Sequence, residues 1–232
     1  MLNKIAPILI SLIFTTIYSV SSAQAVPVNI LPIESNPYGL PYEAHVQNFW
    51  KYLISLPTDK NPMKDEKGVN CANGQTNSNS SIFYLSGGGG GKFDRVCKVP
   101  SNKSVLIPVM TVEVSDKEVP NASVDSLHKI AKKDQDSVTS LYLNIDGKEY
   151  GTKDLIKFRT HTNVFDVLFP QNAVFGASPG KSKAVADGYY VITEILPKGK
   201  HEIHFKSSLI CPGADCLEPN YAQDIKYTLL VE

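Results

Sequence analysis

The four cysteines are the residues whose spacing says most about chemistry in this chain of 232 residues. Proximity in the sequence favours the pairs Cys71–Cys97 and Cys211–Cys216, although three pairings of four cysteines are open. Residues 212–215, Pro-Gly-Ala-Asp, form a turn-prone stretch that can bring the second pair of sulfurs together. Neither pair has the CxxC spacing typical of zinc sites, so we predict two disulfides and neither a metal nor another cofactor.

Two histidines three positions apart, His201 and His204, would suit a metal site if both side chains faced the same way. In an alternating strand they point to opposite faces, and a shared site would need a bulge. We therefore expect His201 to be hydrogen-bonded at the edge of the core and His204 to point outward.

Residue types that serve hydrolysis occur without the motifs that bring them together. His161, Asp166 and Ser178 have the types of a hydrolase triad, but no Gly-x-Ser-x-Gly elbow surrounds any serine. Three glutamates lie on predicted strands: Glu113, Glu194 and Glu202. They leave open a glycosidase with paired carboxylates, because the sequence gives no distance between them.

The glycine-rich segment from Ser86 to Lys92 invites comparison with a phosphate-binding loop. The match fails, because a Walker A motif needs Gly where Ser86 stands and Ser or Thr where Phe93 stands. We expect a flexible loop between two strands, whose glycines allow a ligand to approach the backbone closely.

The segment Gln171–Asp187 is the strongest candidate for binding, because long loops in compact domains are often functional. It contains an aromatic ring that offers an apolar contact, a hydroxyl, two cations and an acid: Phe175, Ser178, Lys181, Lys183 and Asp187. The alternative is that the segment is a solvated, mobile connection between two strands with no binding role.

The elements that must position these residues are mostly short alternating strands. Apolar residues at helical spacing predict an N-terminal amphipathic helix that begins at Pro41 and ends before Pro57. Ser123 is placed to cap a short second helix. The last 45 residues predict three strands in an antiparallel meander. The sequence shows short strands, few helices and no alternation of strands with helices as in βαβ units. This pattern predicts a mainly β protein, an antiparallel β-sandwich of Ig-like or jelly-roll type.

The first 25 residues have the three parts of a secretory signal peptide: Lys4, an apolar run and Ala23-Gln24-Ala25. We expect cleavage before Val26, an extended lead-in over residues 26–40 and one domain over residues 41–232. No later apolar run is long enough to cross a bilayer, which predicts an exported protein, periplasmic or secreted. The chain has 23 basic and 23 acidic residues and no basic tract, so nucleic acid is not an expected partner.

Three segments carry a resemblance to known proteins: Phe49 to Pro57, Arg95 to Pro108 and Asp187 to Phe205. They resemble an uncharacterised family of exported microbial β-sandwich proteins, in which paired tryptophans tend to stand where this chain has Phe49-Trp50. The resemblance implies one exported domain and no particular activity.

Together these patterns predict a non-catalytic binding module with a protein or glycan partner, recognised by loops on a rigid scaffold. Two alternatives stay open. One is an extracellular hydrolase whose site forms only in three dimensions, and the other is a structural component of an envelope or surface assembly.

Overall fold

The computed structural model describes residues 28–75, 79–213, 216–217 and 219–232. The predicted signal peptide, residues 1–25, lies outside the described residues. The described part of the chain contains no helix that is long and apolar enough to cross a membrane.

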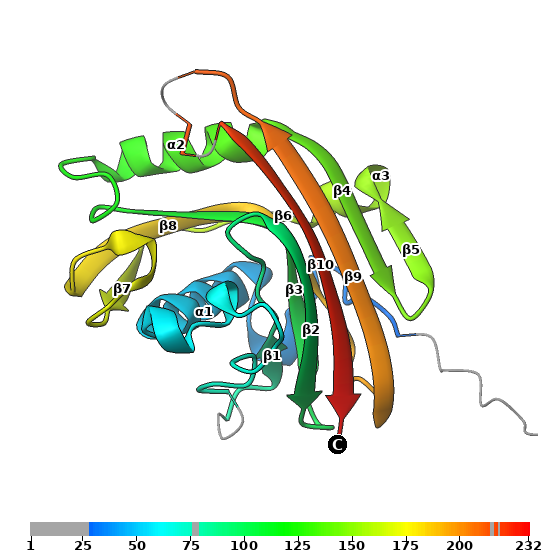
Figure 1. Ribbon diagram of the computed structural model, residues 1–232. Coiled ribbons are helices and arrows are strands. Elements are labelled where there is room, and N and C mark those ends of the chain that lie inside the picture. The colour runs from blue at the N-terminus through cyan, green and yellow to red at the C-terminus, as the bar shows by residue number, and fades with distance from the viewer. Residues whose placement is uncertain (1–27, 76–78, 214–215, 218) are drawn as a thin grey trace, which may run out of the picture.

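The protein is mainly β, as the alternating sequence patterns predict (Figure 1). The helices are α1 (Tyr42–Ser55), α2 (Val124–Asp136) and α3 (Thr152–Leu155). The strands are β1 (Ile82–Tyr84), β2 (Gly91–Val99), β3 (Ser104–Ser115), β4 (Val138–Ile145), β5 (Lys148–Gly151), β6 (Arg159–His161), β7 (Phe165–Phe169), β8 (Gly180–Ile192), β9 (Gly199–Ile210) and β10 (Asn220–Val231).

The strands form two five-stranded sheets. In the first sheet the order is β1-β3-β8-β6, and β7 also pairs with β8. In the second sheet the order is β2-β10-β9-β4-β5. Both sheets are mixed, because β1 pairs parallel to β3 and β2 pairs parallel to β10. The expectation of purely antiparallel sheets is therefore wrong, since each parallel pair joins strands that are not consecutive in the chain.

The predicted C-terminal meander is correct for two of its three strands. β9 and β10 pair antiparallel along their whole length, from Asn220 opposite Ile210 to Val231 opposite Gly199. β8, however, belongs to the first sheet. Residues 193–198 carry the chain from one sheet to the other, so the short connection is a crossing between sheets and not a hairpin.

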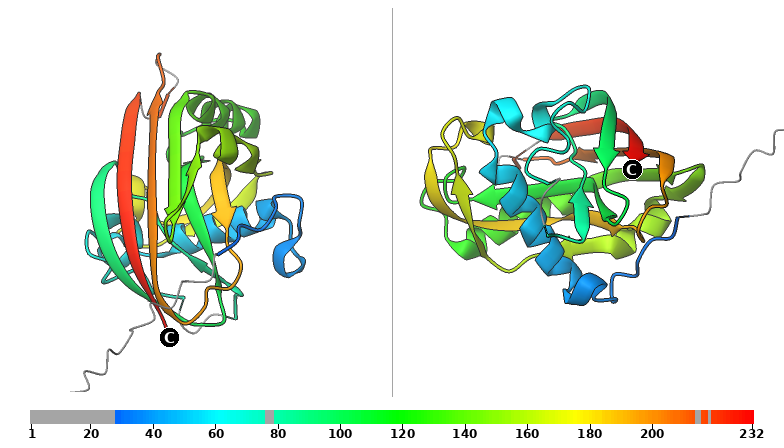
Figure 2. Two further views of the ribbon diagram at one scale, coloured as in Figure 1. Left: turned by 90° about the vertical axis from the view of Figure 1, so that its right-hand side faces the viewer. Right: turned by 90° about the horizontal axis from the view of Figure 1, so that it is seen from below.

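The helix α1 forms where the apolar spacing predicts it. Pro41 is its N-cap, with an extended conformation at φ −66° that leads into the first turn. Its buried stripe includes Tyr42, Val46, Trp50 and Ile54. This stripe packs against β6, β7 and β8, and Figure 2 (right) shows the helix lying across these strands.

The helix α2 packs on the opposite face of the first sheet (Figure 1). The side chain of Ser123 accepts a hydrogen bond from the amide of Ser126, which confirms the predicted cap. Leu127 and Ala131 of this helix form a small core of their own with Val114 and Val185. Alternation along β3 therefore places Val112 and Val114 under α2, and Thr111 and Glu113 on the α1 side.

The main core contains buried side chains from both sheets and from α1. A register shift between Pro108 and Met110 interrupts the pairing of β3 with β8, in keeping with a proline that cannot donate to the ladder. The carbonyl of Val109 accepts hydrogen bonds from Ser207 and Gln223, at 2.7 and 2.9 Å. Polar contacts thus connect the two sheets at the bulge.

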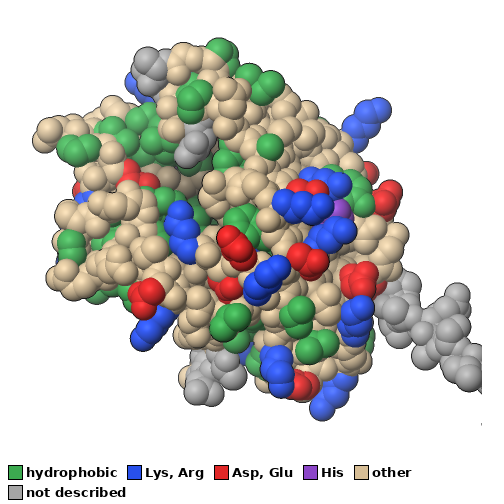
Figure 3. Space-filling view, viewed as in Figure 1, with side chains coloured by type: hydrophobic (Ala, Val, Ile, Leu, Met, Phe, Trp, Pro, Cys, Tyr) green, Lys and Arg blue, Asp and Glu red, His purple; other side chains and the backbone are tan. Residues whose placement is uncertain are grey.

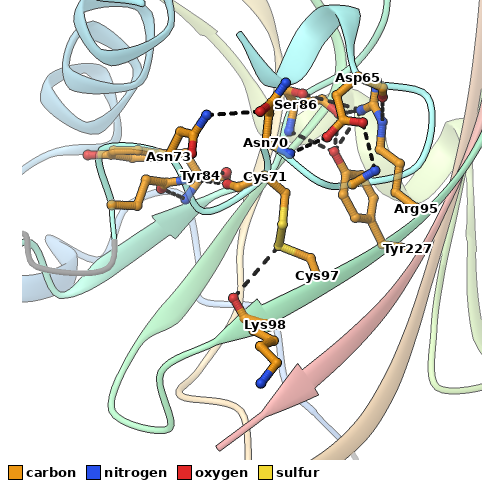
Figure 4. Close-up of a disulfide and its surroundings, with 12 residues drawn as sticks. Asp65, Asn70, Cys71, Asn73, Tyr84, Ser86, Arg95, Cys97, Lys98 and Tyr227 are labelled. Carbon is orange, nitrogen blue, oxygen red and sulfur yellow. Dashed lines mark hydrogen bonds between the residues drawn. A yellow bond between two sulfur atoms is a disulfide. The ribbon is translucent and has the colours of Figure 1, made fainter. Parts of the chain in front are cut away.

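Both predicted disulfides are confirmed. Cys71 is bonded to Cys97, and Cys211 is bonded to Cys216, each with a Cα–Cα distance of 6.0 Å. The first ties the segment after α1 to the edge strand β2 (Figure 4). The second closes the turn between β9 and β10.

Candidate functional site

Figure 3 shows one face of the molecule, with a hollow left of centre and apolar side chains around it. A small cleft lies between α1, the glycine-rich segment and the strands β3 and β10. Its cavity of about 40 Å³ lies between Trp50, Leu53, Gly88, Thr111 and Gln223. We call this space the α1 cleft. It brings together two features that the sequence offered separately: the Phe49-Trp50 pair and the glycine-rich segment.

Phe49 and Trp50 of α1 line the α1 cleft and contact two buried tyrosines. The indole Nε1 of Trp50 donates a hydrogen bond of 2.8 Å to the hydroxyl of Tyr190. Phe49 makes edge contacts with Trp50, Tyr84 and Tyr190, at centroid distances of 5.2, 6.0 and 5.9 Å. Burial raises the pKa of Tyr190, so this hydroxyl stays protonated. Trp50 is only 4% exposed, so its ring is part of the core and not an exposed contact for a ligand.

Glu113 lies on the same face of β3 as Thr111, which lines the α1 cleft. It is 4% exposed, and neither carboxyl oxygen has a hydrogen-bond partner among the described residues. Burial is the largest cause that raises its pKa well above the usual value, and the nearby charges of Glu118 and Asp116 raise it further. Glu113 therefore holds a proton where an ordinary glutamate would be ionised.

Glu118 lies in the turn after β3 and faces the same buried region. Its carboxylate accepts hydrogen bonds from the amide and the hydroxyl of Ser115, at 3.1 and 2.5 Å. Burial raises the pKa of Glu118 as well, against these hydrogen bonds, which lower it. Two carboxyl groups thus share one desolvated site. A protonated carboxyl can act as a general acid, but solvent does not reach the oxygens of Glu113 in this arrangement.

Arg95 holds the glycine-rich segment in place (Figure 4). Its guanidinium is fully buried and donates to the carbonyls of Asp65, Ser86 and Gly87, at 2.6, 2.8 and 3.1 Å. It also donates to the hydroxyl of Tyr227 at 2.7 Å. These partners are neutral, so the charge is stabilised by carbonyl and hydroxyl dipoles and not by an acid.

The expectation of a flexible glycine-rich loop is wrong for its first half. Ser86 is buried, and the amide of Gly88 donates to the side chain of Gln223 at 3.3 Å. The hydroxyl of Tyr221 donates to the carbonyl of Gly88 at 2.9 Å. A Cβ at Gly88 would lie 2.4 Å from the ring of Phe93, so glycine is required for close packing here.

The predicted binding loop Gln171–Asp187 is much shorter than the sequence suggested. β8 begins at Gly180, and its first residues pair with β7 from Phe169↔Gly180 to Phe165↔Ala184. The alternating strand pattern was hidden because small and charged residues occupy this part of β8. The connection that remains is anchored, since Ala173 and Val174 are buried and Thr58 donates to the carbonyl of Asn172. The mobile connection that we considered as the alternative is therefore also wrong.

The five residues proposed on that loop do not form one site. Phe175 is 44% exposed, with φ at +60°, at the tip of the connection. Ser178 accepts a hydrogen bond from Lys117. Lys181 and Lys183 lie on β8 with exposed side chains, whereas Asp187 is buried further along the same strand.

Asp187 instead lines a second pocket, between α2 and the strands β6 and β8. This pocket has a volume of about 290 Å³, and its ionisable lining residues are His128, Lys132, Arg159, His161 and Asp187. We call it the α2 pocket. Arg159 binds Asp187 with two hydrogen bonds, Nε to Oδ1 at 3.0 Å and Nη2 to Oδ2 at 2.8 Å. This bidentate pair fixes both side chains at the base of the pocket.

Asp136 completes the charge pattern at the α2 pocket. Its carboxylate accepts from Nη1 of Arg159 at 2.7 Å and also binds Lys132 one turn earlier on α2. The hydrogen bond from Lys132 is the largest cause that lowers the pKa of Asp136. Two cations and two carboxylates therefore balance each other around the two histidines.

The two histidines on β9 are where the sequence predicted them. His201 is buried, with one ring nitrogen 2.6 Å from Asp146 and the other 2.8 Å from the carbonyl of Pro197. His204 faces outward and lies 2.6 Å from Asp224. They share no ligand position.

The residues considered for hydrolysis are not assembled into a site. His161 lies at the α2 pocket, Asp166 pairs with Lys183, and Ser178 binds Lys117. No hydrogen bond joins these three residues in the described part of the chain. The three glutamates are also separate, because Glu194 binds Asn29, Glu202 binds Lys200, and Glu113 lies beside Glu118.

Sequence reasoning did not identify Arg95, Glu118, His128 and Arg159 as residues of a site. The burial of Arg95 could have been predicted, because the alternation that turns Cys97 inward also turns Arg95 inward. The places of the other three could not, because their neighbours in space come from distant parts of the chain. No family model, no curated protein and no solved structure matches this chain.

Proposed function

We propose that this protein is an exported, non-catalytic binding module that holds a sugar residue of a glycan in the α2 pocket. The observation that carries the proposal is the convergence of hydrogen-bond donors and acceptors there. Arg159, Lys132 and the two histidines can donate, and the carboxylate of Asp187 can accept. Sugar hydroxyls both donate and accept, so such a mixed lining suits them.

The balance of charge favours a glycan over a protein partner. The cations of the α2 pocket are paired with carboxylates, so the site has no strong field for an anion. The central parts of protein interfaces are depleted of charged residues, whereas this pocket is lined by them. Its volume of about 290 Å³ is close to the lower limit of ligand sites, which suits one small polar group of a larger chain.

The scaffold supports recognition by a preformed site. We interpret the two packed sheets as a β-sandwich, with α2 lying on one outer face. The side chains of the pocket come from a helix and two strands, which hold them more firmly than loops do. Two disulfides and the absence of a membrane-crossing helix among the described residues are consistent with an exported protein.

A glycan array of neutral and acidic oligosaccharides, probed with the full mature chain, tests this function. Binding to the best sugar is then measured by calorimetry for the wild type and for His161→Ala and His128→Ala. Loss of one hydrogen bond should weaken binding about 3- to 10-fold. His204→Ala is the matched control, because His204 lies on the outer face of the other sheet.

Two results would contradict the proposal. The wild type could bind none of the sugars at millimolar concentration, or it could bind one sugar that both pocket variants bind equally well. The second result would keep glycan binding and move it to another surface.

A further inference from the structure

A buried carboxyl group, Glu113, and a partly exposed one, Glu118, meet at the end of β3, and no cation of the described residues is paired with either. Glu113 is 4% exposed, and its oxygens have no hydrogen-bond partner among the described residues. Glu118 is held over the same strand end by Ser115, two residues beyond Glu113 on the same face of β3. An unpartnered buried carboxylate costs several kcal/mol, so the arrangement requires that a proton stay on the pair.

The groups that surround the pair do not supply a positive charge. Asp116, on the same turn, accepts from the hydroxyl and the next amide of β8, at Ser182 and Lys183. Lys117 points away and donates to Ser178 and to the carbonyl of Pro179. From β8, the ammonium of Lys183 pairs with Asp166. Tyr190 also lies within electrostatic range of Glu113, and its hydroxyl is neutral.

Residues 116–122, which include Glu118, join β3 to α2, and we call them the β3–α2 turn. Three hydrogen-bonding side chains hold this turn in place. Asp116 binds β8, Lys117 binds the connection between β7 and β8, and Glu118 binds Ser115. Glu118 is the partly exposed member of the acid pair, so it can turn outward while Glu113 stays inside.

We propose that Glu113 and Glu118 share one proton that keeps the β3–α2 turn packed against the end of β3, and that loss of this proton releases the turn. With both carboxyls ionised, two negative charges would lie side by side in a desolvated site. Rotation of Glu118 into water removes the repulsion. This movement gives up the hydrogen bonds to Ser115 and loosens the neighbouring contacts of Asp116 and Lys117.

The sign of the pH dependence follows from the raised pKa values of both acids. The folded state holds the proton more tightly than the unfolded chain does, so the pair stabilises the fold fully below the unfolded pKa, at about 4.3. This contribution is lost as the pH rises through the folded pKa values. The protein should therefore become less stable, and the turn more open, from acidic towards alkaline pH.

Thermal melting and amide hydrogen exchange of the full mature chain between pH 4 and 9 test the switch. In the wild type, the melting temperature should fall as the pH rises, and protection of the β3–α2 turn should fall with it after correction for intrinsic exchange. Glu113→Gln and Glu118→Gln each remove one ionisation, so both should flatten the dependence. At pH 8 each should melt about 2–4 °C or more above the wild type. Glu202→Gln, at an exposed ion pair on the other sheet, is the control.

The proposal is overturned if the two pair variants show the same pH slope as the wild type and the control. Trp50 is the only tryptophan in the chain, and it is bonded to Tyr190 beside Glu113. Its fluorescence in the wild type gives a readout that does not depend on the variants folding. If neither this fluorescence nor the exchange of the turn changes with pH while the protein is folded, no switch exists.

Discussion

Replacing Arg95 by methionine should destabilise the protein more than the loss of any exposed charge. The variant keeps most of the buried volume of the side chain but removes every donor of the guanidinium. The carbonyls of Asp65 and Gly87 then lose the partner that reaches them at 2.6 and 3.1 Å. The carbonyl of Ser86 keeps one, because the hydroxyl of Tyr227 also donates to it at 2.9 Å.

The size of the effect follows from these two orphaned carbonyls. Each buried acceptor left without a partner costs about 1–3 kcal/mol, and burying methionine in place of a charge recovers part of that sum. We expect a net loss of about 2–4 kcal/mol, which lowers the melting temperature by about 4–16 °C for a chain of this size. Arg95→Lys should lose less, because an ammonium can serve some of the same acceptors.

Urea denaturation of the oxidised protein, followed by circular dichroism, gives the free energy of unfolding. Lys98→Met is the matched control, since Lys98 lies on the same strand with an exposed ion pair to Glu232 that is worth about 0–1 kcal/mol. Amide exchange should show the loss of protection in the two segments that Arg95 joins, residues 61–70 and 86–91. An Arg95→Met variant with the unfolding midpoint of Lys98→Met would refute the reasoning, because the carbonyls would then be satisfied without the arginine.

Three further outcomes follow from the packing. In denaturation experiments, Trp50→Ala should lower the free energy of unfolding by about 3–5 kcal/mol. Trp50→Phe should lower it by about 1 kcal/mol, because it loses the hydrogen bond. Equal stability of Trp50→Ala and wild type would contradict the burial of this residue. Replacing both cysteines of the Cys71–Cys97 pair by serine should cost about 3.5 kcal/mol, against about 2 kcal/mol for the Cys211–Cys216 pair, because the first closes the longer loop; the reverse order would count against that account. A Gly-Ser linker in place of Ala173–Ala184 should prevent folding, because it removes buried side chains and the start of β8; a soluble, cooperatively melting variant would show that this segment is dispensable.

The sequence was sufficient for elements whose signals are local. Pro41 and the apolar stripe after it predict α1, and Ser123 predicts the start of α2. The short separations of the cysteines predict both disulfides. The helix signals depend on residues that are close together in the sequence. The disulfides required only a choice among three pairings of four cysteines.

The pairing of the strands could not be predicted from the sequence. Alternation indicates which face of the sheet a side chain lies on, but not which strand lies beside it. The pattern of β8 and β9 is that of a hairpin, yet the two strands lie in different sheets. For the same reason β8 was mistaken at its start for a loop, since Lys181 and Lys183 face solvent beside the edge strand β7. The α2 pocket depends on these partners, so its residues could not be brought together from the sequence.

Arg95 and Glu113 are buried ionisable groups of opposite sign, and they do not neutralise each other. Arg95 cannot lose its proton, so its burial is possible only because carbonyls and a hydroxyl surround it. Glu113 has no such donors, but a carboxyl can take up a proton and become neutral. The first solution is independent of pH and fixes the glycine-rich segment permanently. The second holds only while the proton is bound, and it lies beside a turn that one side-chain rotation can release. Thus the same physical problem, a buried charge without a counter-charge, gives a permanent anchor at β2 and a titratable contact at the end of β3.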